Sequence, residues 1–452
     1  MRRLFLQQHQ KYRLLLLLGD LLIIIGSLSL IFILEAYEPK VVPWNSSKII
    51  TIYFIIIIIT TWVFYVLDLY EISKPRGSTM TLLSICLGLG IVIILYSALA
   101  YYFILLRPGK INLVILILMM IIFTLAWRML FKKLIKIKPQ RLLFVGNTPI
   151  FEDIQQVIQS NYGQYYTIEG HWHSHSHNPT LPNLFNFIKD NDIDTIVYSV
   201  HSTVAKQITN DLITIRFSKK NIIDAYNFYQ QVTRKYPVYF LDDFWLLVNA
   251  QRQNFFPAIG GKVKRAFDVL LVLLLLFVAW PLLLISALAI KLDSAGPVLF
   301  TQERLGQNEV PFRLYKFRTM KNNAEALTGP KWSTADDPRI TRMGKVLRKM
   351  RLDELPQFFN VLKGDMSIVG PRPIRKYFAD ILVQEVPYYR LRFLAKPGLT
   401  GWAQVNYDCA GSNEGQSEKL QYDLFYLVHQ SIWLDLLILF KTVQVVVWGK
   451  GT

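Results

Sequence analysis

AFDVLLVLLLLFVAWPLLLISALAI, residues 266–290, is a long apolar run, and how it meets a membrane sets the arrangement of the second half of this chain. It exceeds the roughly 20 apolar residues that a helix needs to cross a bilayer. Pro281 interrupts it, and a proline inside a helix removes a backbone donor and kinks or breaks the helix. We therefore predict a re-entrant membrane helix over 264–291, which breaks at Pro281 and returns to the side it entered. A straight crossing is the alternative.

Basic residues flank this stretch on both sides: Lys262, Lys264 and Arg265 precede it, and Lys291, Arg304, Arg313, Lys316 and Arg318 follow it. Segments on the cytoplasmic side of a membrane carry an excess of lysine and arginine. Both ends of the stretch are therefore expected on the cytoplasmic side, which favours the re-entrant helix over the crossing.

Four more apolar runs fill the first third of the chain, at 14–34, 49–67, 79–106 and 111–131. Each approaches or exceeds the length of a membrane span, so residues 1–137 are predicted to form a four-helix transmembrane bundle. The first run is too long for the core of a cleavable signal and is expected to stay as a helix. Asp20 lies inside it, and we expect a structural role for this residue rather than proton chemistry.

The composition agrees with a membrane protein. The 452 residues are 52% hydrophobic, with a mean hydropathy of +0.29 and a formal net charge of +18. Basic residues precede the first apolar run and follow the fourth, which places both flanks of the bundle in the cytoplasm. The basic excess suits an anionic membrane surface, and the long apolar runs argue against a nucleic-acid partner.

Residues 138–258 have the pattern of a small Rossmann-like α/β domain. Strands are predicted at 141–146, 194–200 and 237–240, with a helix at 150–159 after the first strand. Only Gly146 stands at the first turn, whereas a dinucleotide fingerprint needs several glycines there. A regulatory or dimerising role is therefore expected in place of cofactor binding.

Histidines alternate within this domain at positions 171, 173, 175 and 177. On a strand they would share one face and could bind a metal. No acidic or cysteine partner is close in the sequence, so a polar loop or sheet edge is favoured. The two cysteines, Cys86 and Cys409, have no metal-binding spacing and are expected to be reduced thiols.

The region 297–372 is dense in the residue types that phosphoryl transfer uses. Its cations include Arg304, Lys316, Arg318, Arg339, Arg342, Arg348, Arg351 and Arg372, and its acids include Asp336, Asp337, Asp353, Glu354 and Asp365. Transfer from a diphosphate needs neutralised oxygens, an in-line nucleophile and exclusion of water. Adjacent Asp353 and Glu354 can supply a nucleophile and a metal ligand.

Mg²⁺ prefers carboxylate and phosphate oxygens, so Asp353 and Glu354 can hold it without a full protein cage. Arg372 lies between two prolines and can act as a rigid phosphate clamp. The alternatives are a solvated helix start for the acidic pair and lipid headgroup binding for arginines, above all Arg375, Arg390 and Arg392.

Three strings resemble the bacterial sugar transferase family: KFRTM (316–320), RITRMGKVLRKMRLDELPQFFNVLKGDMSIVGPRP (339–373) and KPGLTGWAQV (396–405). Members are monotopic polyprenyl-phosphate hexose-1-phosphate transferases that start exopolysaccharide, capsule and O-antigen synthesis. The resemblance covers about 262–452, which implies a mostly α-helical monotopic catalytic domain over 259–452. The N-terminal bundle and α/β domain look like those of the family's long-form members.

The resemblance implies roles for individual residues. Asp353 matches the family's nucleophile, and Glu354 matches its partner near Mg²⁺. Arg348 and Arg372 match arginines around the phosphates, to which Arg304, Lys316 and Arg318 are added as phosphate-binding candidates. Lys264 and Arg265 match a basic pair at the lipid surface before the re-entrant helix. Pro281 matches its break, although Trp280 stands where many members have serine.

The implied function is transfer of a hexose-1-phosphate from a UDP-sugar, glucose or galactose first, to undecaprenyl phosphate at the cytoplasmic face of the bacterial inner membrane. A lipid-acceptor glycosyltransferase that releases UDP and a non-catalytic membrane scaffold are the rivals. A homodimer is expected. Residues 418–448 are predicted to form one or two amphipathic helices on the phospholipid surface.

Overall fold

The computed structural model describes residues 6–36, 46–67, 69–70, 81–82, 84–86, 88–93, 110–134, 138–172, 181–199, 212–213, 215, 220–240, 260–321, 337–407 and 413–447. The chain divides into two compact units, Met1–Ala225 and Tyr226–Thr452. Each unit is considered by itself. The domain boundaries expected at 137/138 and 258/259 stay predictions.

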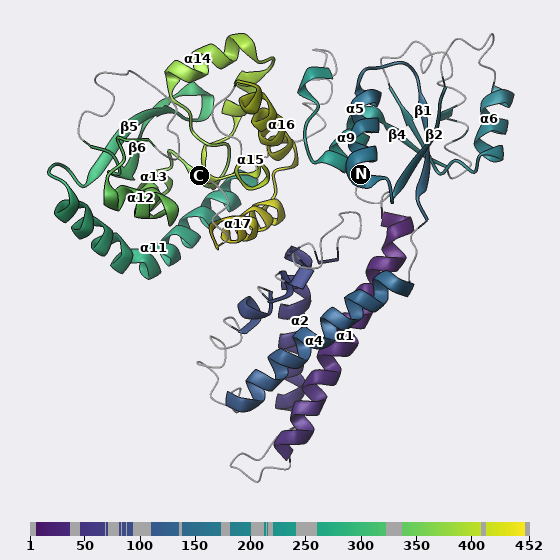
Figure 1. Ribbon diagram of the computed structural model, residues 1–452, viewed down its shortest axis with the longest axis horizontal. Helices are drawn as coiled ribbons and strands as arrows, with labels where there is room; N and C mark the ends of the chain where they lie inside the picture. Colours follow the sequence, from purple (N-terminus) through teal and green to yellow (C-terminus); the bar gives the residue numbers. More distant parts are fainter. Residues whose placement is uncertain are drawn as a thin grey trace. The chain divides into compact units, whose positions relative to one another are not determined.

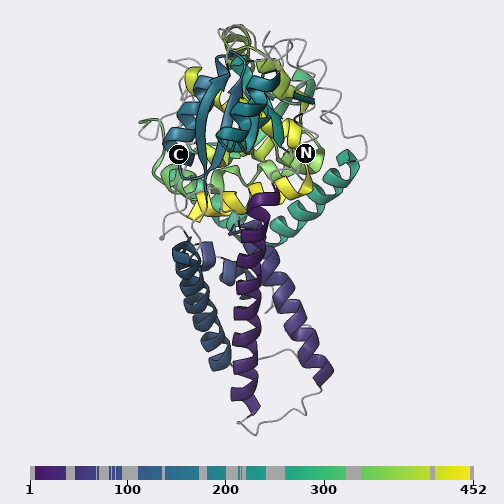
Figure 2. The same cartoon turned by 90° about the vertical axis from the view of Figure 1, so that its right-hand side faces the viewer.

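Apolar helices open the first unit: α1 (Leu6–Ala36), α2 (Ser46–Val66) and α4 (Lys110–Leu134). Helix α1 packs against both α2 and α4 (Figures 1 and 2). Within the described residues, Tyr12–Leu30 and Val114–Leu134 are long and apolar enough to cross a membrane. The third predicted run, 79–106, lies largely outside the described residues, so the four-helix bundle stays a prediction.

A buried ion pair joins α1 to α4. Arg128 Nη2 donates to Asp20 Oδ2 at 2.6 Å, and both side chains are buried. Next to the pair, the Trp127 ring occupies the space where a Cβ on Gly19 would stand, 2.1 Å from the ring, and its Nε1 donates to the Leu16 carbonyl. The expected structural role of Asp20 is therefore met by a partner inside the bundle.

Replacing Arg128 with methionine is expected to loosen this bundle. The Asp20 carboxylate would lose its cation in an apolar setting, at a cost of about 3 kcal/mol. The double variant Asp20→Asn/Arg128→Met removes both charges and should recover most of that loss. Thermal unfolding of the full chain in detergent measures both, and equal midpoints for the single and double variants would contradict the prediction.

The first unit also contains a four-stranded parallel sheet in the order β2-β1-β3-β4. The strands are β1 (Gln140–Val145), β2 (Tyr166–Trp172), β3 (Thr195–Tyr198) and β4 (Asn221–Asp224) (Figures 1 and 2). Helices α5 (Ile150–Val157), continued by the π-helical turn η2 (Ile158–Tyr162), and α6 (Leu181–Asp190) accompany them, whereas α9 (Ala225–Thr233), which directly follows β4, lies almost wholly in the second unit. Residues from α6 and the sheet share one apolar core that includes Leu143, Ile188 and Ile196.

Two of the three predicted strands are confirmed, and the third is wrong. Residues 237–240 contain the 3₁₀ turn η3 (Val238–Phe240), where Pro237 cannot donate to a strand ladder. Strands β2 and β4 were not predicted, because Gly170 and the short polar ends weaken their patterns. His171 lies on β2 with its ring against Phe144 at 5.0 Å, which is a packing contact. Positions 173, 175 and 177 lie outside the described residues.

The second unit is mostly helical. Its helices include α11 (Gly260–Asp293), α12 (Arg342–Lys349), α13 (Gln357–Lys363), α14 (Lys376–Glu385), α15 (Trp402–Asn406), α16 (Asn413–His429) and α17 (Ile432–Val447). An antiparallel hairpin joins β5 (Leu299–Leu305) to β6 (Pro311–Phe317) through the turn η4 (Gln307–Glu309), and β7 (Ser367–Val369) pairs with β8 (Gly398–Thr400) in parallel. The expected mostly α-helical domain therefore also contains two small sheets.

Helix α11 is one continuous helix of 34 residues with Pro281 inside it. The predicted break is wrong in its local form: the chain stays helical through the proline, and Figure 1 shows the helix bending along its length. Near its start, Arg265 donates to the carbonyls of Val361 and Leu362 on α13. Near its end, Ile290 packs with Phe317 and Leu347. Both ends are thus fastened to the same compact unit.

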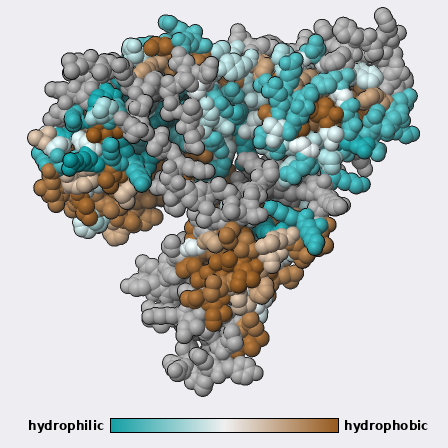
Figure 3. Space-filling model, in the orientation of Figure 1, coloured by the Kyte–Doolittle hydropathy of each residue, from teal (hydrophilic) through white to brown (hydrophobic). Residues whose placement is uncertain are grey.

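Between Leu270 and Leu292, α11 exposes apolar side chains that the described residues do not cover. They include Leu270, Leu274, Phe277, Val278, Trp280, Leu284, Ile285, Leu288 and Leu292. Figure 3 shows hydrophobic residues gathered on this helix. A patch of this kind on a soluble surface would be unusual, and a lipid environment would cover it.

One or two helices were expected near the end of the chain, and two are found, α16 and α17. On an amphipathic surface helix Asp423 and Asp435 would be solvated, but here they are not. Asp423 and Asp435 are buried and receive hydrogen bonds from Arg392 and Lys264. Trp433 is exposed, whereas Trp402 is buried core. Contact of α17 with a membrane therefore stays a prediction.

A segment at the start of the second unit packs on α15 and α16. Tyr236 N donates to the Gln421 carbonyl at 2.9 Å, Lys235 forms an ion pair with Glu418, and Trp402 Nε1 donates to the Arg234 carbonyl at 3.1 Å. Residues 234–236 therefore belong to the same packed body as the C-terminal helices, although they precede the predicted catalytic domain.

Candidate active site

The site is built where the β5–β6 hairpin meets α12 and α13. The Asn360 side chain on α13 donates to the Arg313 carbonyl at 2.7 Å and accepts from Tyr315 N at 3.0 Å, so it bonds to the edge of β6 as a neighbouring strand would. On the other side, a Cβ at Gly344 would lie 2.2 Å from the Thr319 carbonyl. The close approach of α12 to the end of β6 therefore requires glycine there.

The two carboxylates lie on the short 3₁₀ turn η5 (Leu352–Glu354), which follows α12. Arg351 precedes the turn in the left-handed region, with φ of 57°, and reverses the chain so that both acidic side chains point inward. Asp353 is 7% exposed and Glu354 is 9% exposed. The solvated helix start considered for this pair is therefore excluded.

Three cations converge on one oxygen of Glu354. Arg372 Nη2 donates to Oε1 at 2.8 Å, Lys316 Nζ lies 3.2 Å from it, and Arg351 Nη1 lies 3.8 Å from it. Lys316 comes from β6 and Arg372 from the loop after β7, so the cluster joins three parts of the chain. In the part of the chain that the structure describes, Asp353 has no hydrogen-bond partner.

The two neighbouring acids differ in pKa. Burial raises the pKa of Asp353, and the adjacent Glu354 charge adds to that rise, while Lys316 opposes it. Burial alone would also raise the pKa of Glu354, but Arg372, Lys316 and Arg351 outweigh it and hold that pKa well below its usual range. Glu354 is therefore the fixed counterion of the cluster, and Asp353 is the more basic carboxylate, which suits a nucleophile.

The other predicted phosphate-binding residues are only partly brought together. Arg348 Nε donates to Thr319 Oγ1 at 2.9 Å. Burial lowers the pKa of Arg348, and the negative charge of Asp353 opposes that shift. Arg304 reaches the Pro373 carbonyl at 3.5 Å beside the Arg372 loop. Arg318 is away from the cluster: its buried guanidinium donates to the Ser294 and Ala295 carbonyls just beyond the end of α11.

The basic pair, predicted to precede the re-entrant helix, lies in the first turns of α11 and makes contacts inside the protein. Lys264 Nζ donates to Asp435 Oδ2 at 2.7 Å, and Arg265 donates to the two carbonyls of α13 described above. Both residues therefore fasten α11 to the rest of the unit. Their predicted contact with lipid stays a prediction.

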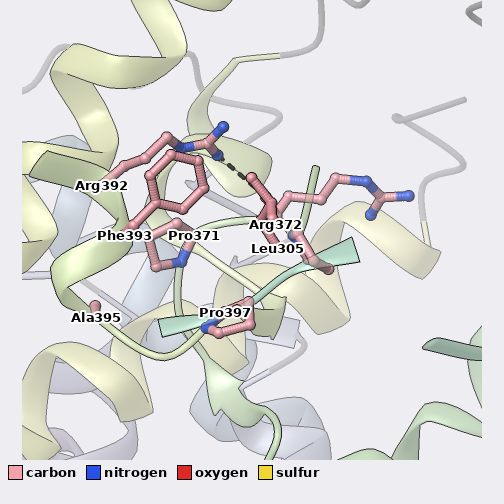
Figure 4. A pocket seen from close by; sticks show the side chains of 9 residues that line it. Leu305, Pro371, Arg372, Arg392, Phe393, Ala395 and Pro397 are labelled. Atoms are coloured by element: carbon pink, nitrogen blue, oxygen red, sulfur yellow. Dashed lines mark hydrogen bonds between the residues drawn. The ribbon is translucent and has the colours of Figure 1, made fainter. Parts of the chain in front are cut away.

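Arg372 also borders a small pocket, drawn in Figure 4. The residues that line it are Leu305, Gly306, Pro371, Arg372, Pro373, Arg392, Phe393, Ala395 and Pro397. Arg392 was considered as a headgroup-binding arginine. It is 6% exposed and bonded inside the protein, so that alternative is wrong for this residue.

The donor set of the site fits Mg²⁺ but not a closed metal cage. Among the described residues, no group of three or more His, Cys, Asp or Glu side chains could hold a metal. The Asp353 carboxylate and the second oxygen of Glu354 can supply oxygen ligands, and Mg²⁺ takes the remainder from phosphate and water. Such a site would depend on a phosphate-bearing substrate.

Several contributing residues were not identified from the sequence. In the sequence Arg351 is only one of many arginines in 297–372, and nothing there predicts its left-handed backbone conformation. Asn360 and Arg392 act through contacts with segments 45 and 20 residues away. No local signal could have revealed those pairings, although the polar Asn360 within an apolar helix was a weak indication.

Together, the fold and the site define a helical membrane protein in which a buried carboxylate pair is surrounded by cations suited to phosphate groups. A sequence model of the family described as bacterial sugar transferase matches residues 259–449. The "Exopolysaccharide production protein PSS" of Rhizobium leguminosarum bv. phaseoli is 43% identical over 196 residues, which cover 42% of this chain and 98% of that protein. The chain belongs to the bacterial sugar transferase family.

Two relatives carry more specific names. The "UDP-N-acetylgalactosamine-undecaprenyl-phosphate N-acetylgalactosaminephosphotransferase" of Aeromonas hydrophila is 46% identical over 189 residues, covering 42% of this chain and 44% of the relative. The "UDP-glucose:undecaprenyl-phosphate glucose-1-phosphate transferase" of Escherichia coli (strain K12) is 44% identical over 189 residues, covering 41% and 40%. The matched part spans less than half of the length of these two relatives.

Proposed function

We propose that this protein transfers a hexose-1-phosphate from a UDP-sugar to undecaprenyl phosphate and releases UMP. The observation that carries the proposal is that the two carboxylates of the pair have different partners. Three cations neutralise Glu354, whereas Asp353 is buried beside them without a hydrogen-bond partner in the described part of the chain. An unpaired, more basic carboxylate next to anchored cations is an arrangement for covalent phosphoryl transfer.

The proposed reaction has two displacements at phosphorus. In the first, a carboxylate oxygen of Asp353 attacks the β-phosphorus of the UDP-sugar. The bond from that phosphorus to the bridging oxygen breaks, and UMP leaves with the electron pair. In the second, an oxygen of undecaprenyl phosphate attacks the same phosphorus, and the bond to Asp353 breaks. The products are undecaprenyl diphosphate sugar and the free carboxylate.

The cations around the pair have defined tasks in this scheme. Glu354 holds Lys316 and Arg372 in place, and in this scheme both would contact the diphosphate and stabilise developing negative charge. Burial of Asp353 would protect the acyl phosphate from water. Mg²⁺, bound by Asp353 and Glu354 with phosphate oxygens, would supply further charge neutralisation to the diphosphate.

The length of α11 and the contacts near its two ends support a re-entrant placement in the cytoplasmic leaflet of the bacterial inner membrane. A straight helix of 34 residues would be about 50 Å long, yet residues near both of its ends are fastened to one compact unit. With its exposed apolar middle in the leaflet, the site would lie at headgroup height. An acceptor anchored by its own hydrocarbon chain would present its phosphate there.

For the first unit we propose a supporting role. The parallel sheet is consistent with a Rossmann-like domain that regulates or dimerises the enzyme, and the apolar helices with a bundle that anchors it. We propose a homodimer, which the mass of the native protein in nanodiscs would test. A monomeric mass would remove this part of the proposal.

The nucleotide product separates the proposed reaction from its rivals. The full chain in nanodiscs with undecaprenyl phosphate and Mg²⁺ should be tested against UDP-glucose, UDP-galactose and their N-acetylated forms, since relatives are named for glucose and for N-acetylgalactosamine. Release of UMP is expected with at least one donor. Release of UDP would indicate a glycosyltransferase, and no nucleotide release from any donor would favour a scaffold.

The pH dependence of UMP release is expected to follow Asp353. Its raised pKa means that protonation of the nucleophile begins above the ordinary range of an aspartate, near 3.8. The rate should therefore fall on the acid side at a higher pH than a solvated carboxylate would give. Initial rates at saturating and limiting UDP-sugar measure this. An acid limb at or below the ordinary value would contradict the assigned role.

A further inference from the structure

The loop that carries Arg372 is fixed through its carbonyl groups. Pro371 and Pro373 have no backbone N–H, so two of the three residues of this loop cannot donate a backbone hydrogen bond. Three consecutive carbonyls accept hydrogen bonds instead: Pro371 from Gly398 N at 2.9 Å, Arg372 from Arg392 Nη2 at 3.1 Å, and Pro373 from Arg304 Nη1 at 3.5 Å. The direction of the Arg372 side chain therefore depends on groups from three other elements.

Arg392 is the buried cation among these supports. It lies on η6 (Tyr389–Leu394), is 6% exposed, and donates from Nη2 to Asp423 Oδ2 at 2.9 Å. Asp423 is 2% exposed. Arg392 Nη1 donates to the Tyr389 hydroxyl, and the guanidinium lies 5.0 Å from the centre of that ring. These contacts fix the planar guanidinium in one orientation, so the second N–H of Nη2 is aimed at the Arg372 carbonyl.

Figure 4 shows the relation between the two arginines. The guanidinium of Arg392 points at the backbone of Arg372, and the Arg372 side chain extends away on the other side. That side chain reaches Glu354 Oε1 at 2.8 Å. The small pocket lined by Pro371, Phe393 and Pro397 borders the loop on the side of Arg392.

We propose that Arg392, held by Asp423, is a positioning residue that orients Arg372 for phosphate binding. This inference rests on the function proposed above, because Arg372 is there the clamp on the diphosphate. Arg392 itself does not touch the substrate. A displaced loop would move the Arg372 guanidinium, and a misplacement of about 1 Å near the reacting groups can lower the rate by about 100-fold.

The variant Arg392→Lys tests this role while it keeps a positive charge at the position, and its thermal midpoint is measured beside the wild type to check the fold. Lysine keeps the charge that pairs with Asp423, but a single ammonium cannot reproduce the two-directional fork that also reaches the Arg372 carbonyl. UMP release is expected to fall about 10- to 100-fold, mainly in kcat. Lys376→Arg is the control: Lys376 lies on α14 in the same unit, forms an exposed ion pair with Asp380, and has a side chain that is 65% exposed, so the rate of this variant should not change.

A double-mutant cycle separates positioning from a merely structural ion pair. If Arg392 acts through Arg372, then Arg392→Lys should change the rate by less than about twofold in an Arg372→Ala background. A structural ion pair would lower the rate by the same factor in both backgrounds. Additive effects, or no effect of Arg392→Lys in the wild-type background, would overturn the proposal.

A second readout does not depend on turnover. The four proteins of the cycle are the wild type, Arg392→Lys, Arg372→Ala and the double variant. Their affinity for inorganic pyrophosphate, measured by the shift of the thermal midpoint, should show the same non-additive pattern. Failure of the wild-type protein to release UMP, with non-additive pyrophosphate binding, would remove the proposed reaction and keep the positioning role. Additive pyrophosphate binding, or no binding to the wild-type protein, would remove the positioning role.

Discussion

Asp353→Asn is expected to abolish UMP release, with a fall of about 1,000-fold or more, and to leave the protein as stable as the wild type or more stable. The amide has the shape of the carboxylate but cannot attack phosphorus. Because burial raises the pKa of Asp353, its ionised form destabilises the folded state at neutral pH. Removing that charge therefore takes away reactivity without taking away a stabilising contact.

Two measurements check this combination. Incubation with a UDP-sugar labelled at the β-phosphorus should label the wild-type protein covalently and leave Asp353→Asn unlabelled. Thermal unfolding of the two proteins at pH 7 should give a midpoint for the variant that is equal or higher. Asp380→Asn is the matched control, since Asp380 forms an exposed pair with Lys376 on α14 and should keep both activity and label. Near wild-type turnover of Asp353→Asn would remove this residue from the nucleophile role.

Glu354→Gln is expected to lose both activity and stability, whereas Asp353→Asn should lose activity alone. Lys316, Arg351 and Arg372 would then face one another around a neutral amide, with their shared counterion gone. Loss of one partner from such a cluster should cost about 2 kcal/mol. The sign with pH follows from the lowered pKa of Glu354: its contribution is present above the ordinary glutamate pKa and is lost as the pH falls.

A compensating variant distinguishes the two losses. Lys316→Met/Glu354→Gln removes one excess positive charge and should recover part of the stability, whereas UMP release should stay low because the phosphate site has lost a cation. The same change in an exposed pair, Asp380→Asn, should cost less than about 1 kcal/mol. Equal stability of Glu354→Gln and wild type from pH 5 to 8 would contradict the counterion role.

Much of the catalytic segment was readable from the sequence, because its signals are local. Each of these signals lies within a few residues of the chain: Pro281 inside an apolar run, Asp353 next to Glu354, and Arg372 between two prolines. The helical interior of α11 was not predicted correctly, since a proline can bend a helix without breaking it when tertiary contacts hold both ends. Strands β2 and β4 were missed because neighbouring strands, and not their own patterns, stabilise them.

The apolar runs, the concentration of basic and acidic residues in 297–372 and the adjacent Asp353 and Glu354 are all visible in the amino-acid sequence. Which cation meets which acid is visible only in the folded chain. Arg318 was placed at the end of α11, Lys264 on Asp435, and Arg392 beneath the Arg372 loop. The reason is physical: the charge of a side chain is a property of one residue, whereas its burial and its partners depend on which distant segments fold against it.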